Sequence, residues 1–190
     1  TPERRIVAEP VTAIASYSSD FNTSGNNDFI SNSASIKMYD GFDDAALHFP
    51  HPYPNESELT VKLKNPIKIA SDNSIMSFDE IVLVEEGLSN HYTETNFFDY
   101  VIVEGTKDGL SWEPLVDGYD SRRETDWLTR YNSQIVNQNS LATGDKSLFK
   151  KRTKNLLKTF EPVVLIFIRF RLNSDTLAFV WGWVIVNIKI

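Results

Sequence analysis

The chain has 190 residues, 41% of them apolar, and a chain of this length and composition can bury one sizeable hydrophobic core. Its 19 basic and 26 acidic residues give a formal net charge of −7, which argues against nucleic acid as the main ligand because phosphate backbones are bound through Lys and Arg. There is no cysteine, which excludes disulfides, zinc–thiolate sites and cysteine nucleophiles.

The N-terminal part of the sequence predicts irregular structure around short extended segments. The first ten residues contain no apolar stretch typical of a signal peptide, and we expect the chain to be a processed or excised fragment. Residues 1–15 predict a lead-in strand, and residues 18–35, rich in Ser, Asn, Gly and Asp, predict a long loop. We expect Phe21, Phe29 and Ile30 to hold that loop against the core.

The middle of the chain predicts regular strands. Residues 45–55 carry three prolines, which donate no ladder hydrogen bond, and therefore predict a loop or a sheet edge. Apolar and polar residues alternate over 59–64, as in a strand with one solvated face. Residues 97–106 and 112–119 predict a hairpin, because the turn between them contains Asp followed by Gly109, which takes positive φ without cost.

Two later segments are less regular. Residues 120–147 are polar and predict an irregular stretch anchored by Trp127 and Tyr131. Residues 146–160 have apolar spacings that suit a helix, but they also alternate as an edge strand would, and we favour the strand. The basic residues within 150–158 are interpreted as guards of such an edge rather than as a site for anionic polysaccharide.

The C-terminus contains two apolar, β-rich runs. Residues 163–172 and 177–190 are joined by a short polar turn and predict a hairpin that ends the chain. We expect its large side chains to form the bulk of the core: Phe167, Phe170, Phe179, Trp181 and Trp183.

Many strands separated by turns, with almost no helix, predict an all-β domain. We expect residues 1–190 to form a single jelly-roll β-sandwich of two antiparallel sheets, with 1–15 as the lead-in strand. Long irregular loops near 18–35, 86–96 and 120–145 suit this fold, because its crossings between sheets need long connections.

Three stretches, in this order, resemble a known family: FFDYVIVEGTKDGLSWEPL (97–115), IFIRFRLNSD (166–175) and WGWVIVNIKI (181–190). Together they resemble the MAM-like and galactose-binding-like jelly-roll modules appended to secreted proteases and surface proteins of bacteria, notably of the Bacteroidetes group. The family pattern has an Asp where this chain has Val186, whereas Asn187 matches. That departure puts an inherited calcium site in doubt.

Calcium is the one cofactor that the sequence leaves open. It needs six to eight oxygen ligands from several loops. Asp99 matches the family and is the first candidate, and Glu94, Glu85 and Glu86 would lie near it if the 86–96 loop folds back. A second possible set is Asp20, Asn26 and Asp28. The alternative interpretation is that these are solvated acids without a metal, and that Asp99 makes a structural hydrogen bond.

Aromatic side chains are the candidates for ligand contact, because their faces stack on sugar rings. Trp127 and Tyr119 lie in or beside the long polar segment, so we expect them to be exposed and nominate them as ligand contacts. Trp112 is a further candidate, but it ends the Asp-Gly hairpin and we favour its interpretation as a cap on the sandwich. Trp181 and Trp183 are interpreted as core residues because of the area that such side chains bury.

No catalytic motif is evident. His48, His51 and His91 lack metal-site spacing, and no G-x-S-x-G is present. We expect a non-catalytic accessory or adhesion module of an exported bacterial protein, secreted, at the cell surface or in the periplasm. It would bind a glycan or a protein surface through loops at one end of the sandwich.

Two alternatives remain open at this point. One is a structural spacer that packs against neighbouring domains of a longer chain, and the other is a hydrolase with an unrecognised site. No membrane span is expected, because the apolar run 163–168 is too short and Arg169 and Arg171 interrupt its continuation.

Overall fold

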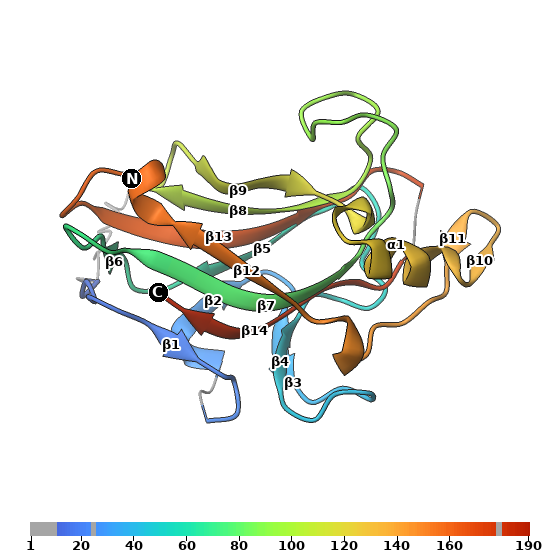
Figure 1. The fold of residues 1–190 in the computed structure, drawn as a ribbon, viewed down its shortest axis with the longest axis horizontal. Helices are drawn as coiled ribbons and strands as arrows, with labels where there is room; N and C mark the ends of the chain where they lie inside the picture. The colour runs from blue at the N-terminus through green and yellow to red at the C-terminus, as the bar shows by residue number, and fades with distance from the viewer. Residues whose placement is uncertain (1–10, 24–25, 178–179) are drawn as a thin grey trace, which may run out of the picture.

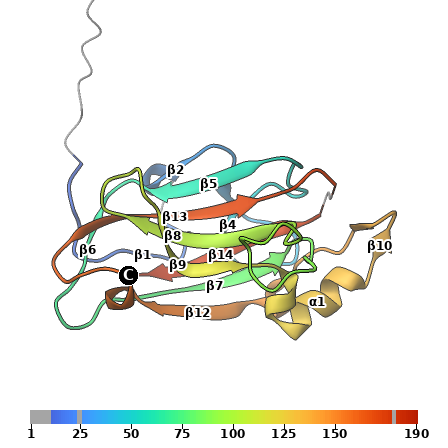
Figure 2. The same ribbon diagram turned by 90° about the horizontal axis from the view of Figure 1, so that it is seen from above.

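The computed structural model describes residues 11–23, 26–177 and 180–190. In this part of the chain, two antiparallel sheets pack face to face, and the predicted jelly-roll β-sandwich is confirmed. Figure 1 shows strands of one sheet in the upper part of the view and strands of the other below them, and in Figure 2, seen from above, strands of the two sheets overlap. No helix among the described residues is both long and apolar enough to cross a membrane.

The first sheet has the strand order β12-β7-β14-β4-β3, with β1 pairing β14. Its strands are β12 (Lys150–Asn155), β7 (Ile75–Leu83), β14 (Gly182–Lys189), β4 (Ala46–His48), β3 (Ser35–Lys37) and β1 (Ser18–Ser19).

The second sheet has the order β2-β5-β13-β8-β9, with β6 pairing β13. Its strands are β2 (Phe29–Ser31), β5 (Glu58–Leu63), β13 (Leu165–Asn173), β8 (Tyr100–Thr106), β9 (Glu113–Tyr119) and β6 (Ile67–Lys68).

The remaining elements lie in the connections. They are helix α1 (Thr125–Asn132), the small hairpin β10 (Ile135–Val136) with β11 (Asn139–Ser140), and the 3₁₀ turns η1 (Asn26–Asp28), η2 (Ser121–Arg123), η3 (Lys146–Leu148) and η4 (Leu156–Lys158). Figure 1 places α1 and the β10–β11 hairpin together at one end of the sandwich.

The core lies between the two sheets and is filled by alternate residues of each strand. In β13, Ile166, Ile168 and Phe170 point inward, whereas the residues between them face outward. Phe170 meets Trp183 of β14 across the sandwich, with ring centroids 5.7 Å apart at 63°. Each such side chain contributes about 1.5–3 kcal/mol by leaving water.

The predicted C-terminal hairpin is wrong. β13 pairs with β5 and β8 in the second sheet, whereas β14 pairs with β7 and β4 in the first. The connection between them crosses from one sheet to the other. Both runs are central strands, and their large residues meet through side chains across the core instead of through a shared hydrogen-bond ladder. Phe179 lies outside the described residues, as does most of the predicted 1–15 strand.

Other predicted elements are confirmed. The alternating segment forms β5, and the predicted β8–β9 hairpin forms with Gly109 at φ 74° in its turn. The segment 146–160 contains β12, which lies at the edge of the first sheet with its lysines, as expected of a guarded edge. Residues 45–55 run from the short strand β4 into an irregular stretch.

Two expectations about anchors differ in outcome. Phe21 and Phe29 are buried and hold the segment 18–35 to the core, whereas Ile30 is 52% exposed because strand alternation in β2 turns it outward. Trp127 and Tyr131 are buried anchors, but they belong to helix α1, which the sequence did not predict. Their spacing of four places both on one helix face.

Candidate functional site

The outer face of the second sheet gathers aromatic and charged side chains on strands that lie side by side. Arg169 in β13 is in register with Lys62 in β5 on one side and with Glu104 in β8 on the other, so all three project to the same face. Arg171 follows two residues later and therefore also points outward. We call this surface the β13 platform; its residues are Lys62, Tyr92, Tyr100, Glu104, Trp112, Phe167, Arg169 and Arg171.

Glu104 is the electrostatic centre of the β13 platform. It is only 4% exposed, and its carboxylate accepts hydrogen bonds from Arg171 Nε at 3.0 Å, from Arg171 Nη2 at 2.9 Å and from Arg169 Nε at 2.7 Å. Burial alone would raise the pKa of this carboxyl, but the hydrogen bonds from Arg171 and Arg169 outweigh it and hold the pKa below its ordinary value. Glu104 is therefore ionised and fixes both guanidinium groups in place.

Aromatic rings lie against these guanidinium groups. The Arg169 guanidinium lies 4.0 Å from the centre of the Trp112 ring, which is the geometry of a cation–π contact. Arg171 lies 5.5 Å from the Tyr100 ring and donates from Nη1 to the Tyr100 hydroxyl at 3.2 Å. Because Trp112 and Tyr100 are only half-buried, part of each ring remains open to solvent.

The loop before β8 adds a third ring to the β13 platform. Figure 1 shows this loop at the upper right, beyond the ends of β8 and β9. Tyr92 of the loop packs 5.3 Å from the Tyr100 ring. It also lies on Gly118 of β9, where an added Cβ would come within 2.5 Å of the Tyr92 ring. Gly118 is therefore needed to let Tyr92 reach the sheet.

Two of the three nominated ligand residues are buried, so the expectation that they are exposed is wrong. Trp127 is 0% exposed, and its Nε1 donates to the Leu148 carbonyl at 2.8 Å. Tyr119 is 5% exposed and donates to the carboxylate of Glu80, with distances of 2.6 and 2.7 Å to its two oxygens. Both are core residues beneath the polar segment. Trp112 alone of the three lies on an accessible face.

The β13 residues of the platform were missed as site residues, although a signal was present. The run around Arg169 and Arg171 is apolar except for these two arginines, which recur with the period of a strand. A strand with large apolar residues on one face and two arginines on the other presents its charges to solvent at the centre of a sheet. Such a pattern marks a surface rather than an interrupted core strand.

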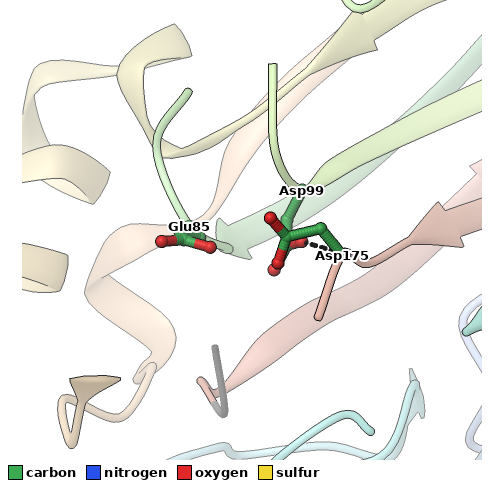
Figure 3. A group of neighbouring side chains, drawn as sticks. All are labelled: Glu85, Asp99 and Asp175. Atoms are coloured by element: carbon green, nitrogen blue, oxygen red, sulfur yellow. Dashed lines mark hydrogen bonds between the residues drawn. The ribbon is translucent and has the colours of Figure 1, made fainter. Parts of the chain in front are cut away.

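A second group consists of three carboxylates at one end of the sandwich, which we call the carboxylate trio. Glu85 follows β7, Asp99 precedes β8 and Asp175 follows β13, and their carboxylate oxygens lie within 4.8 Å of one another. Figure 3 shows the Asp99 and Asp175 carboxylates side by side with Glu85 facing them. Asp99 accepts from the Asp175 backbone N–H at 2.7 Å and from the Tyr53 hydroxyl.

The carboxylate trio contains no compensating cation among the described residues. Burial, together with the charges of Asp99 and Asp175, raises the pKa of Glu85 to about 7. Burial also raises the pKa of Asp99 to about 6, against the hydrogen bonds from Tyr53 and Asp175 that lower it. One oxygen of Glu85, Oε2, is buried without a hydrogen-bond partner. The trio can therefore hold a shared proton or a cation.

The sequence expectation for this group is met in part. Asp99 and Glu85 come together, as the folding back of the loop required, and Asp99 makes the structural hydrogen bonds that were the alternative. Glu94 is exposed on the loop and is not part of the carboxylate trio. Of the second set, Asp28 accepts from the Tyr17 hydroxyl at 3.2 Å, and the Asn26 side chain lies outside the described part of the chain.

The histidine-rich segment forms an aromatic cluster. His48 and His51 hydrogen-bond to each other at 2.8 Å, and His51 stacks on Trp181 at 4.3 Å. Burial lowers the pKa of His48 to about 3 and that of His51 to about 4, so both are neutral near pH 7. Trp181 and Trp183 are core residues, as predicted.

A cavity of about 470 Å³ lies beside this cluster, between loops at the same end of the molecule as the β10–β11 hairpin. Its walls include His51, Leu141 and Trp181. Trp181 is 5% exposed, so it presents no free ring face to a ligand there. The β13 platform combines several partly accessible aromatic rings with guanidinium groups that Glu104 holds in place.

Comparison with known proteins identifies a shared fold. No family model and no curated protein matches the sequence. A family 28 carbohydrate-binding module, described as specific for non-crystalline cellulose, superposes with a TM-score of 0.54 at 12% identity, covering 97% of this chain and 98% of that one.

Two further solved structures are more distant. The K2 cleaved adhesin domain of Lys-gingipain has a TM-score of 0.48 at 9% identity, covering 92% of this chain and 97% of its own. A family 61 carbohydrate-binding module in complex with β-1,4-galactotriose has a TM-score of 0.39 at 8% identity, covering 84% of this chain and 82% of its own. The family 28 module establishes the jelly-roll fold, while the MAM-like part of the resemblance stays a prediction.

Proposed function

We propose that this chain is a non-catalytic binding module that holds a polysaccharide strand against the β13 platform. The observation that carries the proposal is the set of partly open rings, Trp112, Tyr100 and Tyr92, ordered beside Arg169 and Arg171 on one sheet face. Aromatic rings stack on the apolar faces of sugars, and fixed charged donors bind sugar hydroxyls. The similar fold of a module specific for non-crystalline cellulose supports the same class of ligand.

The proposed surface differs from the loop-end site expected from the sequence. A sheet face is rigid, since every strand beneath it is paired on both sides or packed on the core. A rigid platform binds an extended chain with little loss of its own conformational entropy. The module would act outside the cell or at its surface, where polysaccharides are found.

Replacement of Trp112 by Ala tests the proposal. We expect Trp112→Ala to lose at least tenfold in affinity for soluble polysaccharides in affinity electrophoresis and calorimetry, because about 1.4 kcal/mol of stacking is removed. Tyr39→Ala is the matched control, since this half-buried ring packs on His48 away from the β13 platform. Equal losses in the two variants, or binding by neither variant nor wild type, would contradict the proposal.

The alternatives are less well supported. A hydrolase would need a pair of acids that reach substrate; in the carboxylate trio Asp99 is 0% exposed, and Glu85 and Asp175 are half-buried. A spacer would need no ordered charged and aromatic surface on an open sheet face. A protein partner on the β13 platform is the remaining alternative, and binding assays with polysaccharides distinguish it.

We also propose that the carboxylate trio holds a structural cation, with calcium as the expected ion. The buried, unpartnered Oε2 of Glu85 supports this, because carboxylate oxygens are the ligands that calcium prefers. We expect calcium to raise the melting temperature of the wild type at pH 8 and to have a smaller effect on Glu85→Gln. An identical melting temperature with calcium and with chelator would contradict it.

A further inference from the structure

The β13 platform has a positively charged part with unused hydrogen-bond donors. Arg169 donates only its Nε to Glu104, and neither of its Nη atoms makes a hydrogen bond to a described residue. Lys62, its neighbour in register, has no ion-pair partner in the described chain, and its ammonium lies 5.3 Å from the Phe167 ring. Two cations therefore face solvent side by side.

The β13 platform is less acidic than the chain as a whole. Three cations, Lys62, Arg169 and Arg171, meet one buried carboxylate of Glu104 and one exposed carboxylate, Glu58, which lies 3.5 Å from Arg171. Asp117, an exposed acid whose charge acts on Tyr92 of the platform, brings the balance to zero, in a chain whose formal net charge is −7. The positive charge lies in the part of the platform formed by Lys62 and Arg169, and it attracts anionic ligands to that part.

Glu104 has a second cationic partner besides Arg169. Arg171 already gives that carboxylate two hydrogen bonds, at 2.9 and 3.0 Å, and carries a compensating charge. Trp112 lies over the Arg169 guanidinium at 4.0 Å and fixes its plane. A guanidinium held in one plane with two free Nη groups is arranged to bind an oxyanion through parallel hydrogen bonds.

We propose that the polysaccharide recognised by the β13 platform is anionic, with a carboxylate or sulfate group of the sugar seated on Arg169 and Lys62. This inference rests on the proposed function and adds the chemical class of the ligand. A planar carboxylate fits the guanidinium fork, and a sulfate offers the same oxyanion chemistry. Neighbouring rings would stack on Trp112 and Tyr100, which flank the two arginines.

The test compares polysaccharides of the same backbone with and without charge. Wild-type protein is titrated calorimetrically, at low and high salt, with polygalacturonate, fully methyl-esterified pectin, dextran sulfate and hydroxyethyl cellulose. We expect polygalacturonate to bind at least tenfold more tightly than the esterified form, and the difference to shrink at high salt. Binding of dextran sulfate, which has a different backbone, tests whether a sulfate group is accepted as well.

Substitutions then show which residues bind the anionic group of the polymer. Arg169→Gln keeps Glu104 paired with Arg171 and should fold, and we expect it to lose about tenfold in affinity for the charged polymer only. Arg169→Lys, which keeps the charge without the fork, should recover part of that loss. Lys151→Gln is the matched control, because it removes one exposed charge from an edge strand of the other sheet.

The outcomes separate the two proposals. Equal affinity for polygalacturonate and its ester, with neutral binding still sensitive to Trp112→Ala, would overturn the anionic ligand and leave the proposed function standing. Failure to bind any of the four polymers would overturn both. Loss of charged-polymer binding in Lys151→Gln as large as in Arg169→Gln would show a non-specific charge effect and overturn the assigned site.

Discussion

The carboxylate on the β13 platform and those of the carboxylate trio have opposite electrostatic surroundings. Glu104 on the β13 platform is held by two arginines, which keep its pKa low, whereas Glu85 and Asp99 in the carboxylate trio lie near other acids, and their pKa values rise. The first arrangement is complete at neutral pH and can present fixed charges to a ligand. In the second, the negative charge is compensated only when a proton or a cation is bound.

We expect the largest loss of stability when one of the two arginines that pair with Glu104 is removed. Arg171→Met leaves Glu104 buried with a single hydrogen bond from Arg169, and we expect the free energy of unfolding to fall by about 3 kcal/mol. Urea denaturation measures this change. The double variant Arg171→Met with Glu104→Met should recover most of the loss, since it removes the buried carboxylate that has lost two of its three hydrogen bonds. A double variant less stable than the single one would contradict this account.

The carboxylate trio should make stability fall as pH rises. The folded-state pKa values of about 7 for Glu85 and about 6 for Asp99 exceed the ordinary values of 4.5 and 3.8, so the folded state binds these protons more tightly than the unfolded state. Their contribution is fully present below about pH 4 and is lost as pH rises through 6 to 7.

Thermal or urea unfolding of the wild type and of Glu85→Gln, in chelator from pH 5 to pH 8, measures this contribution. Across that range we expect the free energy of unfolding of the wild type to fall by about 1–2 kcal/mol more than that of the variant, after allowance for solvent screening at Glu85. A wild type that becomes more stable than Glu85→Gln as pH rises would contradict the claim that the trio has no compensating cation.

The smallest effect on stability is expected on the β13 platform itself. Gly118→Ala places a Cβ within 2.5 Å of the Tyr92 ring and should displace that ring from Tyr100. Because Tyr92 is partly exposed, we expect the free energy of unfolding to fall by only about 1 kcal/mol, while polysaccharide affinity falls severalfold. Gly109→Ala, in an open turn of the same hairpin, is a control for backbone strain.

How much of the fold could be predicted depended on whether a pattern is local. The alternation in β5 and the Asp-Gly turn of the β8–β9 hairpin are local signals, and both elements formed as predicted. Which strand pairs with which is not local. The polar turn after β13 serves equally as a hairpin turn or as a crossing between sheets, so the pairing of β13 and β14 could not be decided from it.

The candidate sites show the same limit. Asp99 and Glu85 were foreseen as neighbours, but Asp175 was not, because its place depends on β7, β8 and β13 presenting their ends on the same side of the sandwich. Trp127 looked exposed in a polar segment, and only the helix that turns it onto the core explains its burial. Side-chain exposure in irregular segments follows from tertiary packing.

The most direct test of the central claim is a chemical-shift or calorimetric titration of the wild type with polygalacturonate and hydroxyethyl cellulose, with Trp112→Ala alongside. The account predicts binding of at least one polymer, with perturbed signals clustered at Trp112, Tyr100 and Arg169, and a loss of at least tenfold in the variant. Binding that perturbs the His51 and Trp181 cavity instead, and that Trp112→Ala leaves unchanged, would contradict it.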